Sequence, residues 1–267
     1  MKHKDKLFVF DIETVVDVKA ARNLLRLDNE SDEEVLAQFK QHTKDGFPKH
    51  IFHQVVAISY LEADIKRIKE LECYAIKWVR SGKEQAAEKE LVQGFFDHLK
   101  KINARLVSFN GRTFDMPALK YRAILHGIPA SWLYNSGDKW NNYNYRYSSD
   151  WHCDMMDALT DFGAARNIKL DEACAVLGLP GKMDISGAAV SELYAQGRIE
   201  EIRNYCEQDI LNTYLLYLRY ALHTGVLSKD NYDLSVKDLI DYIDLHSEAH
   251  HLGEFKEVWL KRIRHFD

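Results

Sequence analysis

Two carboxylates, Asp11 and Glu13, stand two residues apart directly after an apolar run at residues 7–10. In an extended strand, side chains two positions apart project from the same face. Two carboxylates that converge on one face repel each other unless a cation lies between them, and hard oxygen ligands suit Mg²⁺ or Mn²⁺. The pair is a candidate part of a metal site, although the same spacing occurs at many solvated strand ends.

A third carboxylate, Asp115, follows a predicted strand at 105–109 and the turn-forming pair Asn110-Gly111. We expect a helix that begins near Thr113, with this threonine as its N-cap. Asp115 would then lie in the first helical turn, where the helix dipole alone stabilises a carboxylate. The dipole accounts for one aspartate, but it does not account for the Asn-Gly, Phe and Pro that surround it.

A fourth carboxylate, Asp209, lies in a predicted helix at 199–223, one turn after Tyr205. Residues four apart on a helix share a face, so the phenol and the carboxylate are neighbours. When this pair is considered alone, an ordinary amphipathic surface with a half-buried tyrosine is the simpler explanation.

Together and in this order, the three segments resemble the ExoI, ExoII and ExoIII motifs of the DEDD exonuclease superfamily. The sequences FDIET (10–14) and FNGRTFDMPAL (109–119) are especially similar to the proofreading exonuclease domain of family-B DNA polymerases. Tyr205 stands four residues before Asp209, as in the tyrosine branch (DEDDy), whereas the histidine branch carries a histidine five residues before. The resemblance covers about residues 7–220 and is to a stand-alone predicted 3'–5' exonuclease related to the polymerase domain.

This resemblance implies a ribonuclease-H-like α/β fold, in which helices flank a mixed central β-sheet. It also implies two divalent ions, Mg²⁺ or Mn²⁺, held by the four carboxylates. Asp11 would bridge both ions, and Glu13 and Asp209 would complete one of the two sites. Asp115 would hold the second ion, at least partly through water. Such ions generate a nucleophile on one side of an anionic phosphodiester and stabilise the leaving 3'-oxygen on the other.

By the same resemblance, Tyr205 orients the attacking water, since a phenol with an ordinary pKa near 10 is a poor base alone. Thr14 and Asn110 would approach the terminal nucleotide, and Phe114 would pack near its base. Core packing is an equally simple explanation of Phe114. Lys182 is either a phosphate contact or a solvated loop lysine.

The implied substrate is the 3' end of single-stranded DNA or RNA, and DNA is favoured only because the resemblance is to proofreading domains. Two alternatives remain open. The first is a catalytically weak nucleic-acid-binding module that keeps the fold. The second is an interaction subunit of a repair or replication complex that docks through residues 228–267. Clustered carboxylates argue against a pure binder, because their negative charge repels phosphate.

Composition narrows the class of protein further. A net charge of -5 is unusual for a protein that coats duplex nucleic acid. The four cysteines form no CxxC pair and are interpreted as reduced thiols. No apolar stretch approaches the ~18 residues of a membrane span, so we expect a soluble, cytoplasmic protein without a membrane partner.

Several other polar residues have simpler explanations than a site. His246, His250 and His251 have a spacing that would permit zinc binding, but surface histidines explain them without a metal. Asp154 and Asp157 are interpreted as carboxylates at a helix N-terminus rather than as further ligands. Positive charge is present at six further positions that the sequence does not place on one surface: Lys100, Lys101, Arg105, Arg112, Lys120 and Arg122.

The elements that must position these residues follow from hydrophobic periodicity. We predict strands, the first three in an antiparallel meander, at 7–10, 55–60, 71–76 and 105–109. We predict helices at 83–101, 113–127, 154–162, 170–177, 188–196 and 199–223. Strands followed by a strand–helix alternation and then by helices favour an α/β layout with a mixed sheet.

The chain is expected to divide into two parts. Residues 1–227 are interpreted as the exonuclease domain, with a polar insertion at 17–50 that flanks or covers the first strand. Residues 228–267 are interpreted as an amphipathic helical extension packed on the same domain, with a joint near Asp230-Asn231. Residues 134–150 are expected to be irregular and exposed.

Overall fold

A five-stranded sheet lies at the centre of the computed structural model, which describes residues 4–43, 47–183 and 187–263. Its order is β3-β2-β1-β4-β5. The first three strands form the expected antiparallel meander, whereas β4 and β5 run parallel to β1. The strand bounds are β1 (Lys6–Val16), β2 (His53–Ile68), β3 (Leu71–Ser81), β4 (Arg105–Ser108) and β5 (His152–Asp154).

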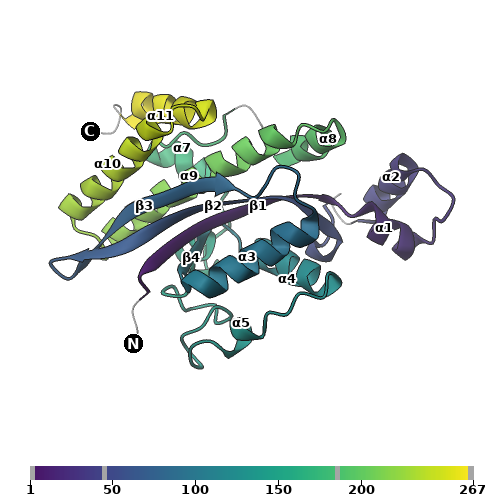
Figure 1. The fold of residues 1–267 in the computed structure, drawn as a ribbon, viewed down its shortest axis with the longest axis horizontal. Helices are drawn as coiled ribbons and strands as arrows, with labels where there is room; N and C mark the ends of the chain where they lie inside the picture. The colour runs from purple at the N-terminus through teal and green to yellow at the C-terminus, as the bar shows by residue number, and fades with distance from the viewer. Residues whose placement is uncertain (1–3, 44–46, 184–186, 264–267) are drawn as a thin grey trace.

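This order and direction of strands define a ribonuclease-H-like fold, which confirms the expected α/β class with a mixed central sheet. Figure 1 shows helices on both faces of the sheet. One face carries α9 (Ile199–His223), α10 (Lys229–Leu245) and α11 (His250–Ile263), and the other carries α3 (Glu88–Ile102) and α4 (Asp115–Leu125). The shorter helical segments are α1 (Val18–Leu25), α2 (Asp32–His42), η2 (His50–Phe52), α5 (Ser131–Asn135), α6 (Met155–Leu159), η3 (Asp161–Gly163), α7 (Leu170–Leu177), η4 (Gly187–Ala189) and α8 (Val190–Ala195).

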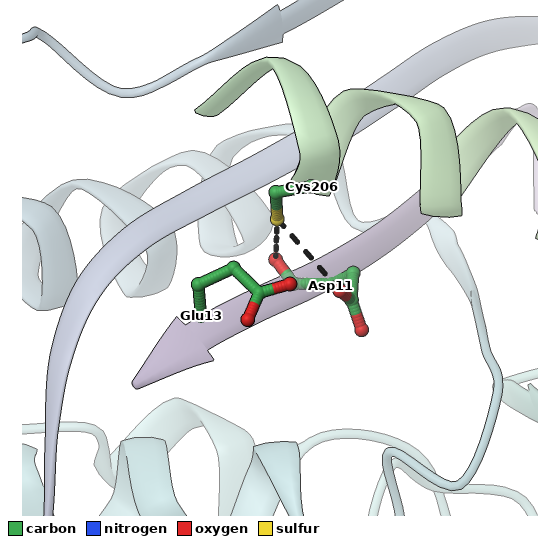
Figure 2. Close-up of side chains that lie close together, drawn as sticks. All are labelled: Asp11, Glu13 and Cys206. Atoms are coloured by element: carbon green, nitrogen blue, oxygen red, sulfur yellow. Dashed lines mark hydrogen bonds between the residues drawn. The ribbon is translucent and has the colours of Figure 1, made fainter. Parts of the chain in front are cut away.

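Alternation along β1 directs its two carboxylates toward α9. Val9 is buried in the apolar cluster beneath α9, while Phe10 points to the opposite face, toward α3. Asp11 and Glu13 continue the row of Val9. Figure 2 accordingly shows both carboxylates on β1 beneath Cys206 of α9.

β1 continues well past its acidic pair, so the expectation that Asp11 stands near the strand end was wrong. The continuation pairs with β2 as far as Val16, and the register shifts between Glu13 and Thr14. Such a bulge bends a strand and redirects its side chains. The continuous apolar run ends at residue 10 because Asp11 and Glu13 face the polar site, whereas Ile12 between them is still buried in the core.

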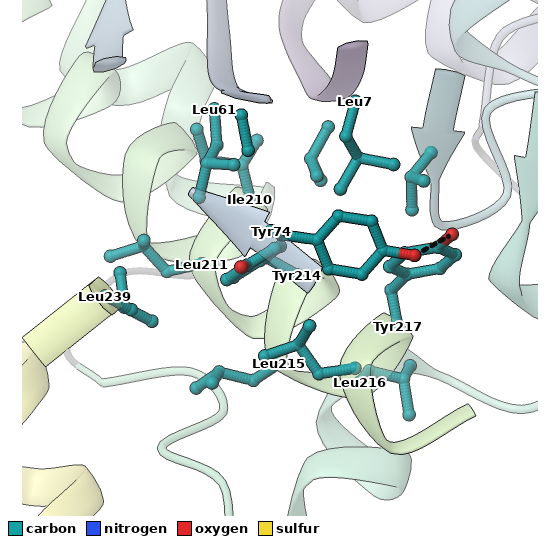
Figure 3. Close-up of a cluster of buried hydrophobic side chains, with 14 of the residues drawn as sticks. Leu7, Leu61, Tyr74, Ile210, Leu211, Tyr214, Leu215, Leu216, Tyr217 and Leu239 are labelled. Carbon is teal, nitrogen blue, oxygen red and sulfur yellow. Dashed lines mark hydrogen bonds between the residues drawn. The ribbon is translucent and has the colours of Figure 1, made fainter. Parts of the chain in front are cut away.

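The larger apolar core lies between the sheet and α9 (Figure 3). Two hydroxyls are buried within this core, those of Tyr74 and Tyr217, and they lie 3.0 Å apart. Arg105 donates to the Tyr217 hydroxyl at 2.9 Å and to Glu72 at 2.7 Å. The guanidinium is therefore paired, as a buried charge must be if it is not to destabilise the core.

α4 begins two residues later than predicted. Asp115 is its first residue, Phe114 takes the N-cap position, and no side chain caps the helix. Thr113 is not the N-cap, because its hydroxyl donates to the Asn110 carbonyl oxygen at 3.2 Å. The helix start is thus set by the loop before it and not by a capping side chain.

α10 covers the open edge of the sheet. Outward-facing amides of β3 donate to its side chains, Tyr74 N to Ser235 Oγ at 3.0 Å, Ile76 N to Asp238 Oδ2 at 2.6 Å and Val79 N to Tyr242 Oη at 2.9 Å. The three acceptors share one face of the helix. They satisfy a strand edge that would otherwise be open to pairing with another chain.

The joint before the C-terminal helices was predicted at the wrong place. α9 ends at His223 and α10 begins at Lys229, so the connection is 224–228. Asp230 and Asn231 lie in the first turn of α10, and the Ser228 hydroxyl caps this turn by accepting from the Asn231 amide at 3.1 Å.

Residues 17–50 contain α1 and α2, which lie beside the sheet in Figure 1. Their shared apolar cluster contains Ala21, Val35 and Phe39, and all three are buried. In its described part, 17–43 and 47–50, the segment thus flanks the end of β1 and does not cover the strand. Within the described ranges, no helix is long and apolar enough to cross a membrane.

Residues 136–151 are irregular, as expected, but they are not exposed throughout. Tyr143 is buried and donates to the Ala104 carbonyl oxygen at 2.8 Å. Lys4 lies over the rings of Tyr143 and Trp151. Aromatic packing therefore anchors a segment whose composition alone suggested exposure.

Candidate active site

The four predicted carboxylates line one cavity of about 540 Å³ on the sheet. Tyr205 also lines it, together with three of the four predicted substrate contacts. These residues come from β1, the loop before α4, the first turn of α4, the 168–182 segment and α9, so the fold brings distant parts of the chain together. The complete wall is Asp11, Ile12, Glu13, Phe109, Asn110, Phe114, Asp115, Met156, Ile168, Lys169, Leu170, Asp171, Lys182, Tyr205 and Asp209.

Asp115 reaches β1 at the point where β1 and β4 separate. The two strands pair over Leu7–Val9 and Arg105–Val107, after which β4 ends and β1 continues. Beyond this pairing, the Ile12 amide donates to Asp115 Oδ1 at 3.2 Å. In α/β sheets, ligands bind at such crevices beyond the carboxyl ends of strands.

Asp154 holds the loop that leads to Asp115. Its carboxylate accepts hydrogen bonds from Asn110 N at 2.9 Å and from Arg112 N at 2.8 Å. It also accepts from the Met156 amide at 3.0 Å and so caps α6. The interpretation of Asp154 as a carboxylate at a helix N-terminus is confirmed, and the structure adds this second contact with the loop.

The conformation of the same loop depends on an asparagine and a glycine. Asn110 has φ of 65°, in the left-handed region that asparagine tolerates better than most residues. At Gly111, a Cβ atom would lie 2.5 Å from Ser108 Oγ, so a larger residue would displace the loop. The Asn-Gly pair that stood out in the sequence therefore fixes the approach of the backbone to Asp115.

α9 supplies the remaining groups of the site from one turn. Tyr205 and Asp209 lie one turn apart, and both line the cavity. Between them, Cys206 Sγ lies 3.5 Å from the Asp11 carbonyl oxygen and 3.7 Å from Asp11 Oδ2 (Figure 2). Cys206 thus connects α9 directly to β1.

Burial and mutual repulsion raise the pKa of the carboxyls in the cavity. The pKa values of Asp11 and Glu13 lie well above their ordinary range, because both groups are buried and face other carboxylates. Burial also raises the pKa of Asp115 to about 7 and that of Asp209 to about 6. The positive charge of Lys182 opposes the shift at Glu13 and Asp209.

Glu13 is only 9% exposed, and in the described part of the chain its carboxylate forms no hydrogen bond. A buried carboxylate without a partner is costly. Ligand atoms of Asp11, Glu13 and Cys206 lie within 4.8 Å of one another. A divalent cation prefers hard oxygen ligands, and it would neutralise the negative charge of these carboxylates.

Tyr205 cannot act as a base at neutral pH. It is 5% exposed. Burial, followed by the charges of Asp209 and Glu13, raises the pKa of its hydroxyl above the ordinary value. The phenol therefore keeps its proton and is available as a hydrogen-bond donor.

The predicted substrate contacts differ in their placement. Asn110, Phe114 and Lys182 line the cavity. Phe114 is half-buried, packs edge-on against His53 at 4.9 Å between ring centroids, and belongs to no apolar core cluster of the described residues. Thr14 does not line the cavity. Its hydroxyl instead lies 2.8 Å from His53 Nδ1. It lies behind the ring that Phe114 contacts.

The basic residues considered from sequence do not form one positive surface. Arg105 is buried and pairs with Glu72, and Arg122 is buried and pairs with Asp17 and Glu88. Arg112 Nη2 donates to a backbone carbonyl at 2.7 Å. Three of the six cations are therefore structural.

The histidine trio is likewise not a zinc site within the described ranges. His246 Nδ1 lies 2.8 Å from the Tyr242 carbonyl oxygen, whereas His251 Nε2 lies 2.8 Å from Glu207. No metal-ligand group of the described residues includes these histidines. Sequence reasoning also missed Asp171 and Cys206 as neighbours of the site, since neither stands at a position that the motifs mark.

The chain matches, over residues 45–259, the family described as predicted 3'-5' exonucleases related to the exonuclease domain of PolB. The match spans most of the chain, which therefore belongs to this family. The matched range contains Asp115, Tyr205 and Asp209. It begins after β1, which carries Asp11 and Glu13.

Two curated relatives are DNA polymerase epsilon catalytic subunits A. The protein from Aspergillus fumigatus is 26% identical over 195 residues, which are 66% of this chain and 8% of the polymerase. The protein from Emericella nidulans is 26% identical over 202 residues, which are 68% of this chain and 9% of the polymerase. The chain thus spans less than a tenth of the length of these relatives.

A solved structure of a family B DNA polymerase, from the hyperthermophilic archaeon Pyrobaculum calidifontis, is also similar. The alignment covers 90% of this chain and 29% of the polymerase, with 16% identity and a TM-score of 0.47.

Proposed function

We propose that the chain is a metal-dependent 3'–5' exonuclease that hydrolyses single-stranded DNA from its 3' end. The convergence of Asp11, Glu13, Asp115 and Asp209 on one cavity is the observation that carries the proposal. Such a cluster destabilises the fold in the absence of a cation. In a protein that binds nucleic acid without cleaving it, the cluster would also repel the phosphates. Both costs are accounted for if the cluster exists to hold metal.

The donor set fits two Mg²⁺ or Mn²⁺ ions. All four groups are carboxylates, which are preferred ligands of these hard cations. Asp11, Glu13, Asp115 and Asp209 would hold these ions. When bound, the ions supply Lewis-acid activation of water and stabilise charge on the leaving oxygen.

Tyr205 positions the attacking water in this proposal. Its raised pKa keeps the hydroxyl protonated, and the side chain lines the cavity one helical turn from Asp209. The phenol can therefore orient a water oxygen, but it cannot accept the water's proton. That proton leaves to solvent or to a carboxylate that the cations do not fully neutralise.

The cavity wall also suggests how a strand end is held. Phe114 offers a half-buried ring for stacking on the terminal base, which is tolerant of sequence. Asn110 offers a side-chain amide, and Lys182 brings the positive charge needed beside a phosphate. Thr14 supports this wall indirectly through His53 in our proposal. DNA is proposed over RNA because the curated relatives are DNA polymerase subunits.

Digestion of matched 5'-labelled DNA and RNA single strands, with Mn²⁺ or with a chelator, tests this function. We expect a ladder of shortened 5'-labelled DNA that requires metal and disappears in Asp209→Asn. Asp233→Asn is the control, because it removes an exposed carboxylate that pairs with Lys229 and does not line the cavity. A mobility shift without shortening would identify a binding module instead.

A further inference from the structure

A row of buried polar side chains runs across the sheet from the carboxylate site. Asp11 of β1 lies opposite Ser59 of β2, and Ser59 lies opposite Ser81 of β3. Side chains directly opposite each other share a face of the sheet, so this row points toward α9. The Ser59 side chain is fully buried, and its hydroxyl lies 2.6 Å from that of Ser81.

Two consecutive residues of α9 contact this row. Cys206 Sγ lies 3.5 Å from the carbonyl oxygen and 3.7 Å from Oδ2 of Asp11, at the inner end of the row. Ser81 donates to Glu207 Oε1 at 2.7 Å. A hydroxyl has one hydrogen to donate, so the Ser59 hydroxyl must be the donor in its bond to Ser81. The hydrogen bonds therefore run in one direction, from Ser59 to Glu207.

The row ends at the C-terminal helix α11. His251 Nε2 lies 2.8 Å from Glu207 Oε2, and the two side chains are only 15% and 10% exposed. A cavity of about 410 Å³ between α9 and α11 adjoins this end. The hydrogen bonds from Ser59 to His251 thus connect α11 to the turn of α9 that also carries Cys206, the neighbour of Asp11.

Stability alone does not account for this row. The neighbouring positions on the same sheet face, Leu61, Ala63 and Val79, are apolar and buried. A core of the same shape could be apolar throughout, and a buried polar network gives no advantage in stability unless every member is satisfied. Asp11, at the inner end of the row, lines the cavity. The other four side chains of the row do not line it: Ser59, Ser81, Glu207 and His251.

We propose that Ser59, Ser81, Glu207 and His251 are positioning residues that orient Asp11, through Cys206, for divalent-metal binding. The proposal rests on the proposed function in treating Asp11 as a metal ligand. Partners behind the ligands of a metal site fix ligand orientation, and their loss weakens metal binding without removing a ligand. The C-terminal helix α11 is thereby coupled to the metal site.

Calorimetric titration of Mn²⁺ into Ser81→Ala tests this coupling. The substitution interrupts the row without touching the cavity, and we expect about tenfold weaker Mn²⁺ binding. Tyr242→Phe is the matched control, because it removes a hydroxyl that bonds the same strand at Val79 but lies outside the row. Its Mn²⁺ affinity should equal that of the wild type. Glu207→Gln keeps an oxygen acceptor for Ser81 and should retain most of the affinity.

If Ser81→Ala fails to fold, His251→Ala tests the same coupling from the α11 end of the row. Loss of this contact should also weaken Mn²⁺ binding, by about threefold, because His251 lies farther along the row from Asp11 than Ser81 does. Wild-type affinity in both Ser81→Ala and His251→Ala, or an equal loss in Tyr242→Phe, would overturn the coupling. If the row variants lose Mn²⁺ affinity but the wild type cuts no nucleic acid, the coupling stands and the exonuclease proposal fails.

Discussion

Replacement of Asp115 by asparagine is expected to stabilise the metal-free protein while it inactivates the site. Asp115 is 4% exposed, and burial raises its pKa from an ordinary 3.8 to about 7. At pH 7.5 the folded protein therefore holds an unfavourable charge that the unfolded chain tolerates. Asparagine has nearly the same shape, and its side-chain oxygen can still accept from the Ile12 amide.

The size of this effect follows from the raised pKa of Asp115. The difference between 3.8 and about 7 corresponds to about 4 kcal/mol, at about 1.4 kcal/mol per pKa unit. Neighbouring carboxyls share their protons, and the new amide NH₂ group needs a partner of its own, which costs about 1–2 kcal/mol. We expect a net gain of about 2 kcal/mol, or about 5 °C in Tm for a chain of this size.

The dependence on pH has a defined sign. A carboxyl whose pKa is raised by folding binds more protons in the folded state, so its contribution to stability falls as pH rises. For Asp115 the loss begins near 3.8 and is complete above about 7. The advantage of Asp115→Asn should therefore be small near pH 4, grow between pH 4 and 7, and stay constant above that.

Thermal unfolding in chelator, followed by circular dichroism across this pH range, measures the difference. Addition of Mn²⁺ should reverse the order of stabilities, because only the wild type retains all four ligands and gains from binding. The reasoning would be refuted if Asp115→Asn were destabilised at pH 7.5 in chelator, or if its advantage were largest at low pH.

Three further changes separate catalysis from stability. Tyr205→Phe should slow DNA cleavage about a hundredfold without changing Mn²⁺ affinity, and a parallel loss of affinity would contradict its role in orienting water. Asp238→Ala should lower the free energy of unfolding in urea by about 1–2 kcal/mol, since it leaves the Ile76 amide at the sheet edge unpaired, with turnover unchanged at low temperature. Gly111→Ala should reduce turnover and stability together, because its Cβ would strike Ser108; wild-type kinetics would show that the loop is not tightly fixed.

The acidic residues of the site were recognisable because their spacing and order carry information that does not depend on packing. Asp11 and Glu13 alternate on a strand, and Tyr205 and Asp209 share a helical face. The structure brings these residues and Asp115 to one cavity, although their chemical roles remain proposals. The meander and the long helix α9 were likewise predictable, since each buries a strongly apolar face.

The features that sequence reasoning missed depend on contacts between distant segments. β1 continues past Asp11 because β2 pairs with it as far as Val16. Hydrophobic periodicity cannot detect this pairing. β5 has only three residues, too few for a pattern, yet it presents Asp154 to the loop before α4. The start of α4 was misplaced because Thr113 bonds its own loop and does not cap the helix.

The C-terminal helices illustrate the same limit. Their amphipathic pattern predicted helices, but it did not reveal that Ser235, Asp238 and Tyr242 would serve as acceptors for a strand edge. Nor did the spacing of the histidines reveal that His251 contacts Glu207. Polar residues on a helix face have no periodic signature that distinguishes solvent contact from a backbone partner.

Anomalous diffraction from crystals soaked in Mn²⁺ tests the central claim most directly. We predict two peaks inside the cavity, one shared by Asp11, Glu13 and Asp209 and the other contacting Asp11 and Asp115. Asp11→Asn crystals should lose both peaks. Mn²⁺ bound only elsewhere on the protein, with the four carboxylates free of metal at saturating concentration, would contradict the account.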